Sequence, residues 1–182
     1  MQKSEVRSQE SGVRRSRGAG GQAAAELAFV IPLMMIILFG AFQVARVFYL
    51  YHTLQKALRG GAGLLTRAST INYCDAEDAA LTDARNFIVF GNLQGSGDPL
   101  VRGLTPEMIQ VLPERTDAES TVVTECLCTE EADSCDIAVG GRSADFVVVN
   151  LREGFPMEVP FPYLNLATIT LRVSVRMPVT GG

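Results

Sequence analysis

The hydrophobic pattern changes character near residue 45. Residues 27–45 read LAFVIPLMMIILFGAFQVA, an apolar run in which Gln43 is the one side chain with a polar group. As an α-helix at about 1.5 Å per residue, this run spans roughly 28 Å, close to the thickness of the hydrocarbon core of a bilayer. A run that is this long and apolar on all sides predicts a single transmembrane helix rather than the core helix of a small domain.

Beyond the apolar run, hydrophobic residues recur every three or four positions, from Val47 to Gly61. This spacing is typical of one buried helix face, so we expect the helix to continue to about residue 66 as an amphipathic stem. Three glycines, at positions 60, 61 and 63, oppose this, because each costs up to about 1 kcal/mol relative to alanine inside a helix. The stem should pack against a folded domain.

The pattern after residue 71 is mixed. Asp75 is suited to cap a short helix at 76–90, and Gly91 is suited to end it. The run FVVVNL at 146–151 fits either a central strand or a sheet edge used for subunit contact. Four strand-like runs are expected, at 108–112, 120–128, 144–151 and 167–177, the last with strict alternation of apolar and polar residues.

These elements predict an α+β fold, in which one short helix and a small antiparallel sheet pack on the stem. The predicted organisation has four parts: a basic leader at 1–21, a transmembrane helix at 22–45, an amphipathic stem at 46–70 and an α+β head at 71–182.

Charge is distributed very unevenly around the apolar run. Residues 1–21 carry five basic and two acidic side chains, whereas the whole chain has a net charge of -4. A basic block directly before an apolar run is an orientation signal that keeps this end in the cytoplasm and places the head outside it. The acidic overall balance argues against a nucleic-acid-binding protein.

A cleaved secretory signal peptide would also combine a basic end with an apolar stretch. Its small-residue cleavage site should follow the apolar run, but the alanines at 23–25 precede it. Aromatic residues such as Phe48 and Tyr49 follow instead, and they suit the headgroup interface beside a retained helix. We therefore expect the apolar helix to remain in the mature protein.

Glu26 stands at the beginning of the apolar run, where a carboxylate is costly to bring toward lipid. A cut between Gly21 and Gln22 would create a new amine four residues before Glu26. Residues i and i+4 share one helix face, so the carboxylate could pair with this amine or with the amine of a neighbouring chain. The first turn of the helix also favours negative charge.

A basic leader ending in glycine, a glutamate five residues later and an apolar helix resemble a type IV prepilin. The stretch GQAAAELAFVIPLMMIILFGAFQVARVFYLYHTLQKALRGGAGLLTR is similar to the TadE-like pseudopilins of the tight-adherence (Flp) pilus system. The resemblance implies that a prepilin peptidase cuts after Gly21, that Gln22 is the mature N-terminus, and that Glu26 serves processing or subunit docking. Leu27 and Gln22 depart from the aromatic residues of many prepilins, which favours a minor pilin over a major one.

The resemblance also implies partners and location. The partners are a prepilin peptidase, other pilins, an inner-membrane assembly platform with its ATPase, and the lipid bilayer. The protein would be a non-enzymatic, single-pass protein of the bacterial inner membrane with an extracytoplasmic head, and it could enter the pilus fibre. No catalytic residue, cofactor, small-molecule substrate or nucleic-acid partner is expected.

Three other interpretations stay open. The first is a plain signal anchor, in which Gly21 is linker and Glu26 marks the membrane edge. The second is an anchored binding or adhesion module. The third is a membrane-tethered enzyme, which is disfavoured because His52 is the only histidine and lies among interfacial aromatic residues.

Four cysteines, Cys74, Cys126, Cys128 and Cys135, lie in the predicted extracytoplasmic head, where thiols oxidise. An even number predicts two disulfides. Cys126 and Cys128 share one face of the expected strand and are poorly placed to pair with each other, while Cys135 can return to either. We predict Cys128–Cys135 and Cys74–Cys126, the second tying the start of the head to its sheet.

Metal binding is the alternative use of these residues. A zinc site would add Asp133 or Asp136 to the thiolates, but paired CxxC spacing is missing. The acidic residues around the third and fourth cysteines lack the ligand ladder of an EF-hand loop. We therefore expect no metal site.

Overall fold

The computed structural model describes residues 19–68, 71–117, 121–129, 134–158, 160–161, 164–165 and 168–180. The helix α1 (Ala19–Leu65) is 47 residues long and runs without interruption through Pro32. The chain divides into two compact units, residues 1–44 and 45–182. The expected helix end near residue 66 is confirmed within one residue.

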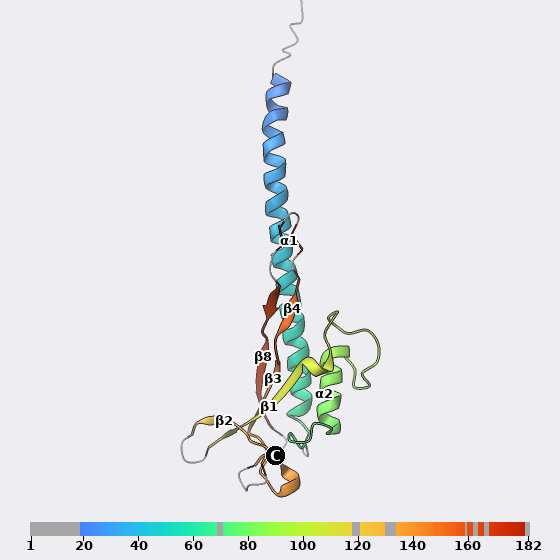
Figure 1. Ribbon diagram of the computed structural model, residues 1–182, viewed down its shortest axis with the longest axis vertical. Coiled ribbons are helices and arrows are strands. Elements are labelled where there is room, and N and C mark those ends of the chain that lie inside the picture. Colours follow the sequence, from blue (N-terminus) through green and yellow to red (C-terminus); the bar gives the residue numbers. More distant parts are fainter. Residues whose placement is uncertain are drawn as a thin grey trace, which may run out of the picture. The chain divides into compact units, whose positions relative to one another are not determined.

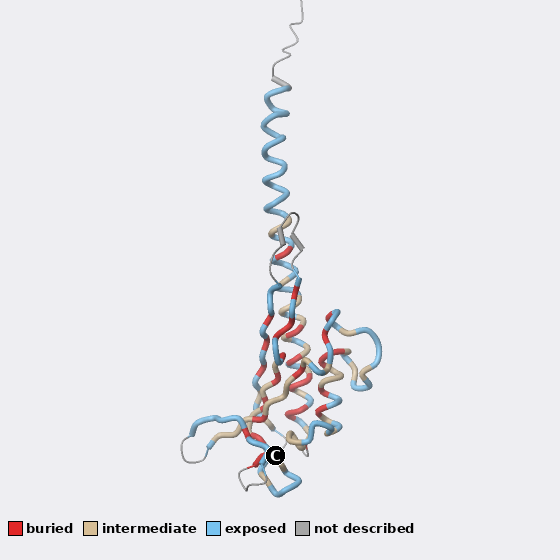
Figure 2. The backbone as a smooth tube through the Cα atoms, in the orientation of Figure 1, coloured by how far each residue is buried: buried red, intermediate tan, exposed pale blue. Residues whose placement is uncertain are grey.

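In the first unit, residues 21–38 of α1 are exposed (Figure 2), whereas Gln43 near its end is 6% exposed. Phe29 is 82% exposed and Leu38 is 60% exposed. Within the described residues, Gly21–Leu65 is the one helix that is long and apolar enough to cross a bilayer. Within the part of the chain that the structure describes, no protein core covers residues 21–38.

In the second unit, α1 has one buried face. Leu54, Leu58, Ala62 and Leu65 are at most 1% exposed, and their spacing of four, four and three residues places them in one stripe. They belong to a single hydrophobic core with residues of α2 (Ala79–Phe90) and of the strands. In Figure 1, strands β3 and β8 run along one side of this part of α1 and α2 along the other. The predicted amphipathic stem is confirmed.

The predicted N-terminus of the second helix is wrong by three residues. Asp78 is the cap of α2, and its Oδ1 accepts a hydrogen bond of 2.8 Å from the Ala80 N–H. Asp75 instead accepts from the Glu77 N–H and forms a turn before the helix. Either aspartate can cap a helix, but Asp78 also accepts at 3.0 Å from the Asn72 N–H, which fixes it at the helix start. Gly91 ends the helix with φ 75°, as predicted.

Two glycines of α1 allow α2 to approach closely. A Cβ on Gly61 would overlap Ile88 Cγ1 and lie 3.2 Å from the backbone oxygen of Ala84. A Cβ on Gly60 would lie 2.7 Å from Phe87 Cε1. The glycines that weaken the helix in the sequence therefore have a packing role, because the helices could not meet at this distance with larger residues.

The described strands form three antiparallel sheets. The largest has four strands in the order β2-β1-β3-β8, while β4 pairs with β7 and β5 pairs with β6. The strands are β1 (Ile109–Thr116), β2 (Val123–Glu125), β3 (Phe146–Leu151), β4 (Phe155–Met157), β5 (Pro160–Phe161), β6 (Leu164–Asn165), β7 (Ile169–Leu171) and β8 (Ser174–Pro178). Two short 3₁₀ helices, η1 (Pro106–Met108) and η2 (Ile137–Val139), complete the head. The fold is α+β, as predicted.

The run FVVVNL is the central strand β3, paired with β1 on one side and β8 on the other. Its residues alternate between buried and half-buried, with Val147 and Val149 fully buried in the core. On the opposite face, the Arg176 guanidinium lies 4.1 Å from the centre of the Phe146 ring and 2.7 Å from the Glu114 carboxylate. An ion pair and a cation–π contact therefore cross the outer face of the sheet.

The single strand predicted at 167–177 is wrong, because it is divided between two sheets. β7 pairs with β4 and β8 pairs with β3, with a break at residues 172–173. The cause lies in the strands with which this segment pairs. A turn closed by a Gly154 N–H to Leu151 O hydrogen bond separates β3 from β4. Gly154 has φ 78°, which favours glycine, and a Cβ there would lie 2.6 Å from Thr170 Cγ2. Ala167 lies outside the described residues.

The strand predicted at 120–128 is also shorter than expected. β2 is three residues long, and all three are exposed; Ser120 lies outside the described residues. The strand predicted at 108–112 extends to Thr116 in β1, because β3 pairs with it along its length as far as Glu114. Pairing with β3 therefore lengthens β1, whereas β2 stays short at the edge of the sheet.

The close approach at Gly61 leads to a stability prediction. Gly61→Ala should lower the free energy of unfolding of the head by about 1–3 kcal/mol, the usual cost of overpacking a core. Gly63→Ala is the matched control, because a Cβ there meets nothing within 4 Å, and it should raise stability by up to about 1 kcal/mol. Denaturant unfolding of the detergent-solubilised chain measures both. Equal unfolding midpoints for Gly61→Ala and wild type would contradict this account of the helix contact.

Candidate functional site

The predicted processing segment lies in the first turns of α1. Gly21, Gln22 and Glu26 are all exposed, and a Cβ on Gly21 would meet nothing within 4 Å. The Gln22 side-chain amide donates a hydrogen bond of 3.3 Å to Glu26 Oε1. The i, i+4 geometry expected from the sequence is therefore present in the uncut helix, with an amide as the donor.

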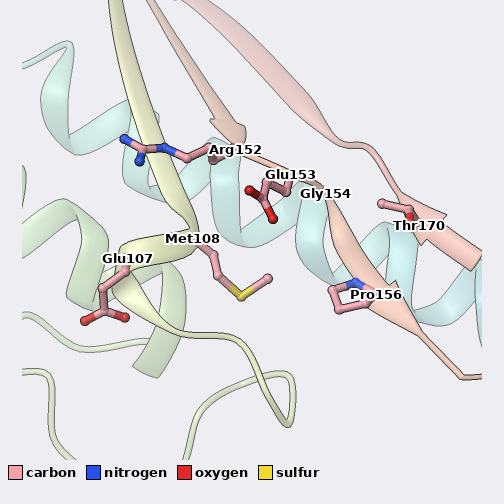
Figure 3. A pocket seen from close by; sticks show the side chains of 7 residues that line it. All are labelled: Glu107, Met108, Arg152, Glu153, Gly154, Pro156 and Thr170. Atoms are coloured by element: carbon pink, nitrogen blue, oxygen red, sulfur yellow. The ribbon is translucent and has the colours of Figure 1, made fainter. Parts of the chain in front are cut away.

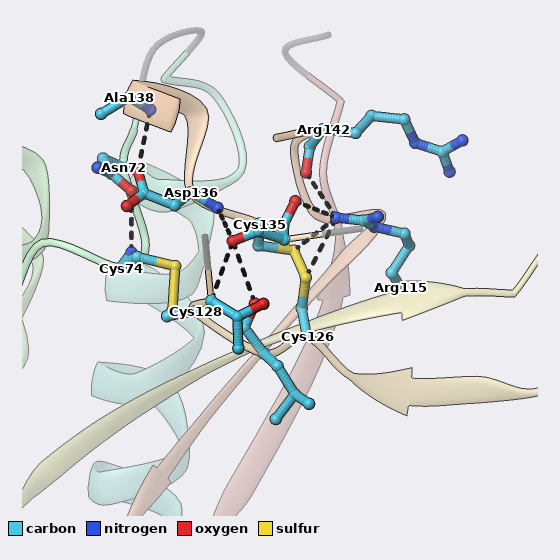
Figure 4. Close-up of a disulfide and its surroundings, with 12 residues drawn as sticks. Asn72, Cys74, Arg115, Cys126, Cys128, Cys135, Asp136, Ala138 and Arg142 are labelled. Atoms are coloured by element: carbon cyan, nitrogen blue, oxygen red, sulfur yellow. Dashed lines mark hydrogen bonds between the residues drawn. A yellow bond between two sulfur atoms is a disulfide. The ribbon is translucent and has the colours of Figure 1, made fainter. Parts of the chain in front are cut away.

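Both predicted disulfide pairs are wrong, although the number of disulfides is right. The structure joins Cys74 to Cys128 and Cys126 to Cys135, with Cα–Cα distances of 5.4 and 5.8 Å (Figure 4). No cysteine is free. All four thiols are thus consumed in disulfides, which leaves none for the zinc alternative.

Local hydrogen bonds explain why Cys135 meets Cys126 rather than Cys128. The Cys126 N–H donates to Pro113 O at 2.9 Å, so Cys126 stays beside β1 after β2 ends. The Arg115 side chain on β1 donates from Nη2 to Ser134 O at 2.7 Å. The residue before Cys135 is thereby held at the same strand, and Cys128 is left to reach Cys74.

The same Arg115 nitrogen is surrounded by further acceptors. It lies 3.3 Å from Cys126 Sγ, 3.2 Å from Cys135 Sγ and 2.9 Å from Arg142 O (Figure 4). One guanidinium therefore links β1, the buried disulfide and the loop around Arg142. The alternation along β1 puts Arg115 on the inner face, but its partners lie up to 27 residues away and give no signal in the sequence.

Asn72 links the Cys74–Cys128 disulfide to the aspartates that cap two helices, Asp78 of α2 and Asp136 of η2. Its side chain accepts at 3.0 Å from the Cys74 N–H and donates at 2.9 Å to Asp136 Oδ1. Asp136 in turn caps η2 by accepting from the Ala138 N–H at 2.9 Å. Asp136, one of the residues considered for metal binding, thus serves as a cap. Asp133 lies outside the described residues.

Tyr73 lies between the two hydrophobic clusters of the head and is partly buried. Burial, together with the negative charge of Asp78, raises the pKa of Tyr73 to about 12. Among the described residues its buried hydroxyl has no hydrogen-bond partner.

A shallow hollow of about 420 Å³ lies beside η1 and the turn that follows β3 (Figure 3). The hydroxyl of Thr105 lowers the pKa of Glu107 by hydrogen bonding to its carboxylate. The charged groups are exposed at the rim, and the lining contains neither cysteine nor histidine. The hollow is lined by Glu107, Met108, Arg152, Glu153, Gly154, Pro156 and Thr170.

His52 lies on α1, where its ring meets Tyr51 edge-on with 5.9 Å between the ring centres. Within the part of the chain that the structure describes, no group of three or more histidine, cysteine or acidic residues is arranged to hold a metal ion.

The fold and these sites define a disulfide-stabilised α+β head carried on a long apolar N-terminal helix. Residues 21–62 match the family model described as TadE-like protein, so this stretch is a TadE-like domain. The match lies wholly within α1 and confirms the resemblance that the sequence shows there. No curated protein and no solved structure matches the chain.

The Cys74–Cys128 bond closes a loop of 54 residues. In the loop-entropy model, removing it through Cys74→Ser/Cys128→Ser should lower the free energy of unfolding by about 4 kcal/mol. Peptide mapping should find Cys126–Cys135 intact in this variant. Under strongly reducing conditions both disulfides open, so variant and wild type should then differ by less than about 0.5 kcal/mol. A difference that persists in reductant would mean that the substitutions act through packing instead.

The raised pKa of Tyr73 predicts that its phenolate forms only near pH 12, above the usual tyrosine pKa of 10. Because folding favours the neutral phenol, the head should lose stability as pH rises from the usual tyrosine pKa near 10 toward about 12. Ultraviolet titration of Tyr73→Phe should lack the component that wild type shows near pH 12. Asp78→Asn keeps a good capping residue and should lower the pKa of Tyr73 only in part, because burial is the larger cause. A full return of that pKa to about 10 would contradict this order of causes.

Proposed function

We propose that this chain is a minor pilin, or pseudopilin, needed to assemble a Tad-type pilus. The observation that carries the proposal is the match of residues 21–62 to the TadE-like family, since it covers the apolar run and most of the stem of α1 and begins at Gly21. On this proposal the chain has no enzymatic role. It acts through its helix and its head as a structural subunit.

The cut proposed after Gly21 is supported by the exposure of the residues on both sides of that bond. Gly21 and Gln22 are both exposed, and a Cβ on Gly21 would meet nothing within 4 Å. Glycine weakens the helix at this point. A peptidase can therefore reach the Gly21–Gln22 bond once the helix opens locally at this glycine.

The cut also supplies a partner for Glu26. In the uncut chain Glu26 accepts a hydrogen bond from the neutral side chain of Gln22. The new amine at Gln22 would stand one helical turn away and carry a positive charge. A charged donor strengthens a hydrogen bond to a carboxylate, and the amine of a neighbouring pilin can take the same place. Glu26 would then dock the subunit at the edge of the lipid.

Location follows from charge and cysteine chemistry. The basic leader favours a cytoplasmic N-terminus, with residues 22–45 crossing the inner membrane. Two disulfides require an oxidising compartment, which supports an extracytoplasmic head. The proposed partners are the prepilin peptidase, other pilins and the inner-membrane assembly platform.

Intact-mass measurement tests the processing step in cells that contain a prepilin peptidase. Wild type should lose residues 1–21, and Gly21→Ala should keep them. Gly40→Ala is the matched control, since it places a methyl in equally open space on the same helix and should be processed normally. Retention of the leader in wild type would favour the plain signal anchor or the anchored adhesion module.

Glu26→Gln tests docking separately from cleavage. Losing a hydrogen bond to a charged group costs about 1.5 kcal/mol, so association with other pilins should weaken roughly tenfold. Co-purification from membranes and the number of surface pili report this loss, with Glu77→Gln on the exposed surface of the head as control. Unchanged association and pilus number in Glu26→Gln would overturn the docking role.

A further inference from the structure

Arg115 occupies an unusual place in the head, because one of its nitrogens meets both sulfurs of a disulfide. Nη2 lies 3.2 Å from Cys135 Sγ and 3.3 Å from Cys126 Sγ, and it donates to the carbonyl oxygens of Ser134 and Arg142 (Figure 4). Cys135 is fully buried and Cys126 is 8% exposed, so this contact is shielded from water. The same side chain therefore touches the reacting atoms and holds the backbone beside one of them.

Chain entropy alone does not produce the observed pairing. Cys126–Cys135 closes a separation of nine residues, whereas Cys128–Cys135 would close one of seven. The entropy of loop closure depends weakly on length and favours the shorter, incorrect loop by about 1.5-fold. Something else must bring Cys135 to Cys126.

We propose that Arg115 directs the pairing of the four cysteines, so that Cys126–Cys135 closes first and Cys74 and Cys128 are left to form the second bond. β1 carries Arg115 and is paired with β3 from Ile109 to Glu114, independently of any cysteine. The Cys126 N–H donates to Pro113 O on the same strand. The Arg115 bond to Ser134 O then brings the neighbouring Cys135 to this place.

Arg115 also favours the chemistry of closure. With glutathione disulfide as oxidant, the Cys126 thiolate attacks one of its sulfurs, forms a mixed disulfide and releases one glutathione thiolate. The Cys135 thiolate then attacks the Cys126 sulfur and releases the second glutathione thiolate. Two electrons pass to the oxidant, and the two cysteine protons end on the released thiolates through solvent.

A guanidinium beside the sulfur lowers the pKa of a thiol and increases its thiolate fraction. Nucleophilicity falls as the pKa falls, so a tenfold gain in thiolate becomes about a threefold gain in rate. The electrostatic effect therefore has a modest expected size, and placement of Cys135 must add to it.

Trapping of early disulfides tests the proposal on the full chain in detergent micelles. The chain is reduced, reoxidised with glutathione disulfide, quenched by alkylation at short times and mapped by peptide mass analysis. Wild type should form Cys126–Cys135 first. In Arg115→Met, Cys128–Cys135 should form at least as often, and closure of Cys126–Cys135 should slow by about threefold or more. Arg115→Lys keeps the charge and should restore part of the rate.

Arg142→Met is the matched control. It removes an arginine side chain that is exposed and pairs with Asp145 at 3.6 Å, and it leaves the Arg142 carbonyl in place. It should keep the wild-type order. Because the first bonds are counted in trapped chains, the test holds even where Arg115→Met never reaches the final fold. The same first bond at the same rate in Arg115→Met and wild type would overturn the proposal.

Discussion

The burial of one face of α1 determines how the head is built. From residue 45 onward the helix has a stripe of leucine and alanine that reaches the core, and both α2 and the sheet contribute to the same core. The stripe can come close to α2 because Gly60 and Gly61 leave room for Phe87 and Ile88. Helix propensity is given up at these two positions in exchange for close contact, and the buried surface compensates for the loss.

At the disulfide end the head relies on polar and covalent links instead of apolar core. The second hydrophobic cluster is small, with Cys126, Cys135 and Ala144 as its buried members. Arg115, Asn72 and the Cys74–Cys128 disulfide connect distant segments there, while Cys126–Cys135 joins residues nine apart. Such an arrangement is expected where too few apolar side chains are present to hold loops by burial alone.

The sequence was informative where structure depends on neighbours along the chain. The apolar run, the stem stripe and the glycine stop of α2 follow from local periodicity and capping, and all three are confirmed. The sequence was misleading where two nearby residues could take the same structural role. Asp75 and Asp78 are both good caps, and the choice between them depends on the Asn72 backbone.

The remaining differences come from contacts between distant residues. Apolar and polar residues do alternate at 167–177, but the turn at Gly154 separates the two strands with which this segment pairs and so divides it. Cysteine spacing allowed Cys135 to reach either neighbour, and the decision belongs to a side chain on β1, 20 residues away. The contact between Gln22 and Glu26 could be predicted from the sequence because the two residues lie one helical turn apart.

The TadE-like match concerns α1, and most of the head lies outside the matched residues. The match ends at residue 62, inside α1, so the role it supports concerns the helix and what surrounds it. The segment 114–136, which holds three of the four cysteines, has eight acidic residues and one basic residue, Arg115. The side chain of Arg115 turns inward, where Nη2 meets two sulfurs and donates to two carbonyl oxygens. The position of Arg115 is therefore explained by its contacts with the disulfide and the backbone beside it, because these are the groups that its inward-facing nitrogen reaches.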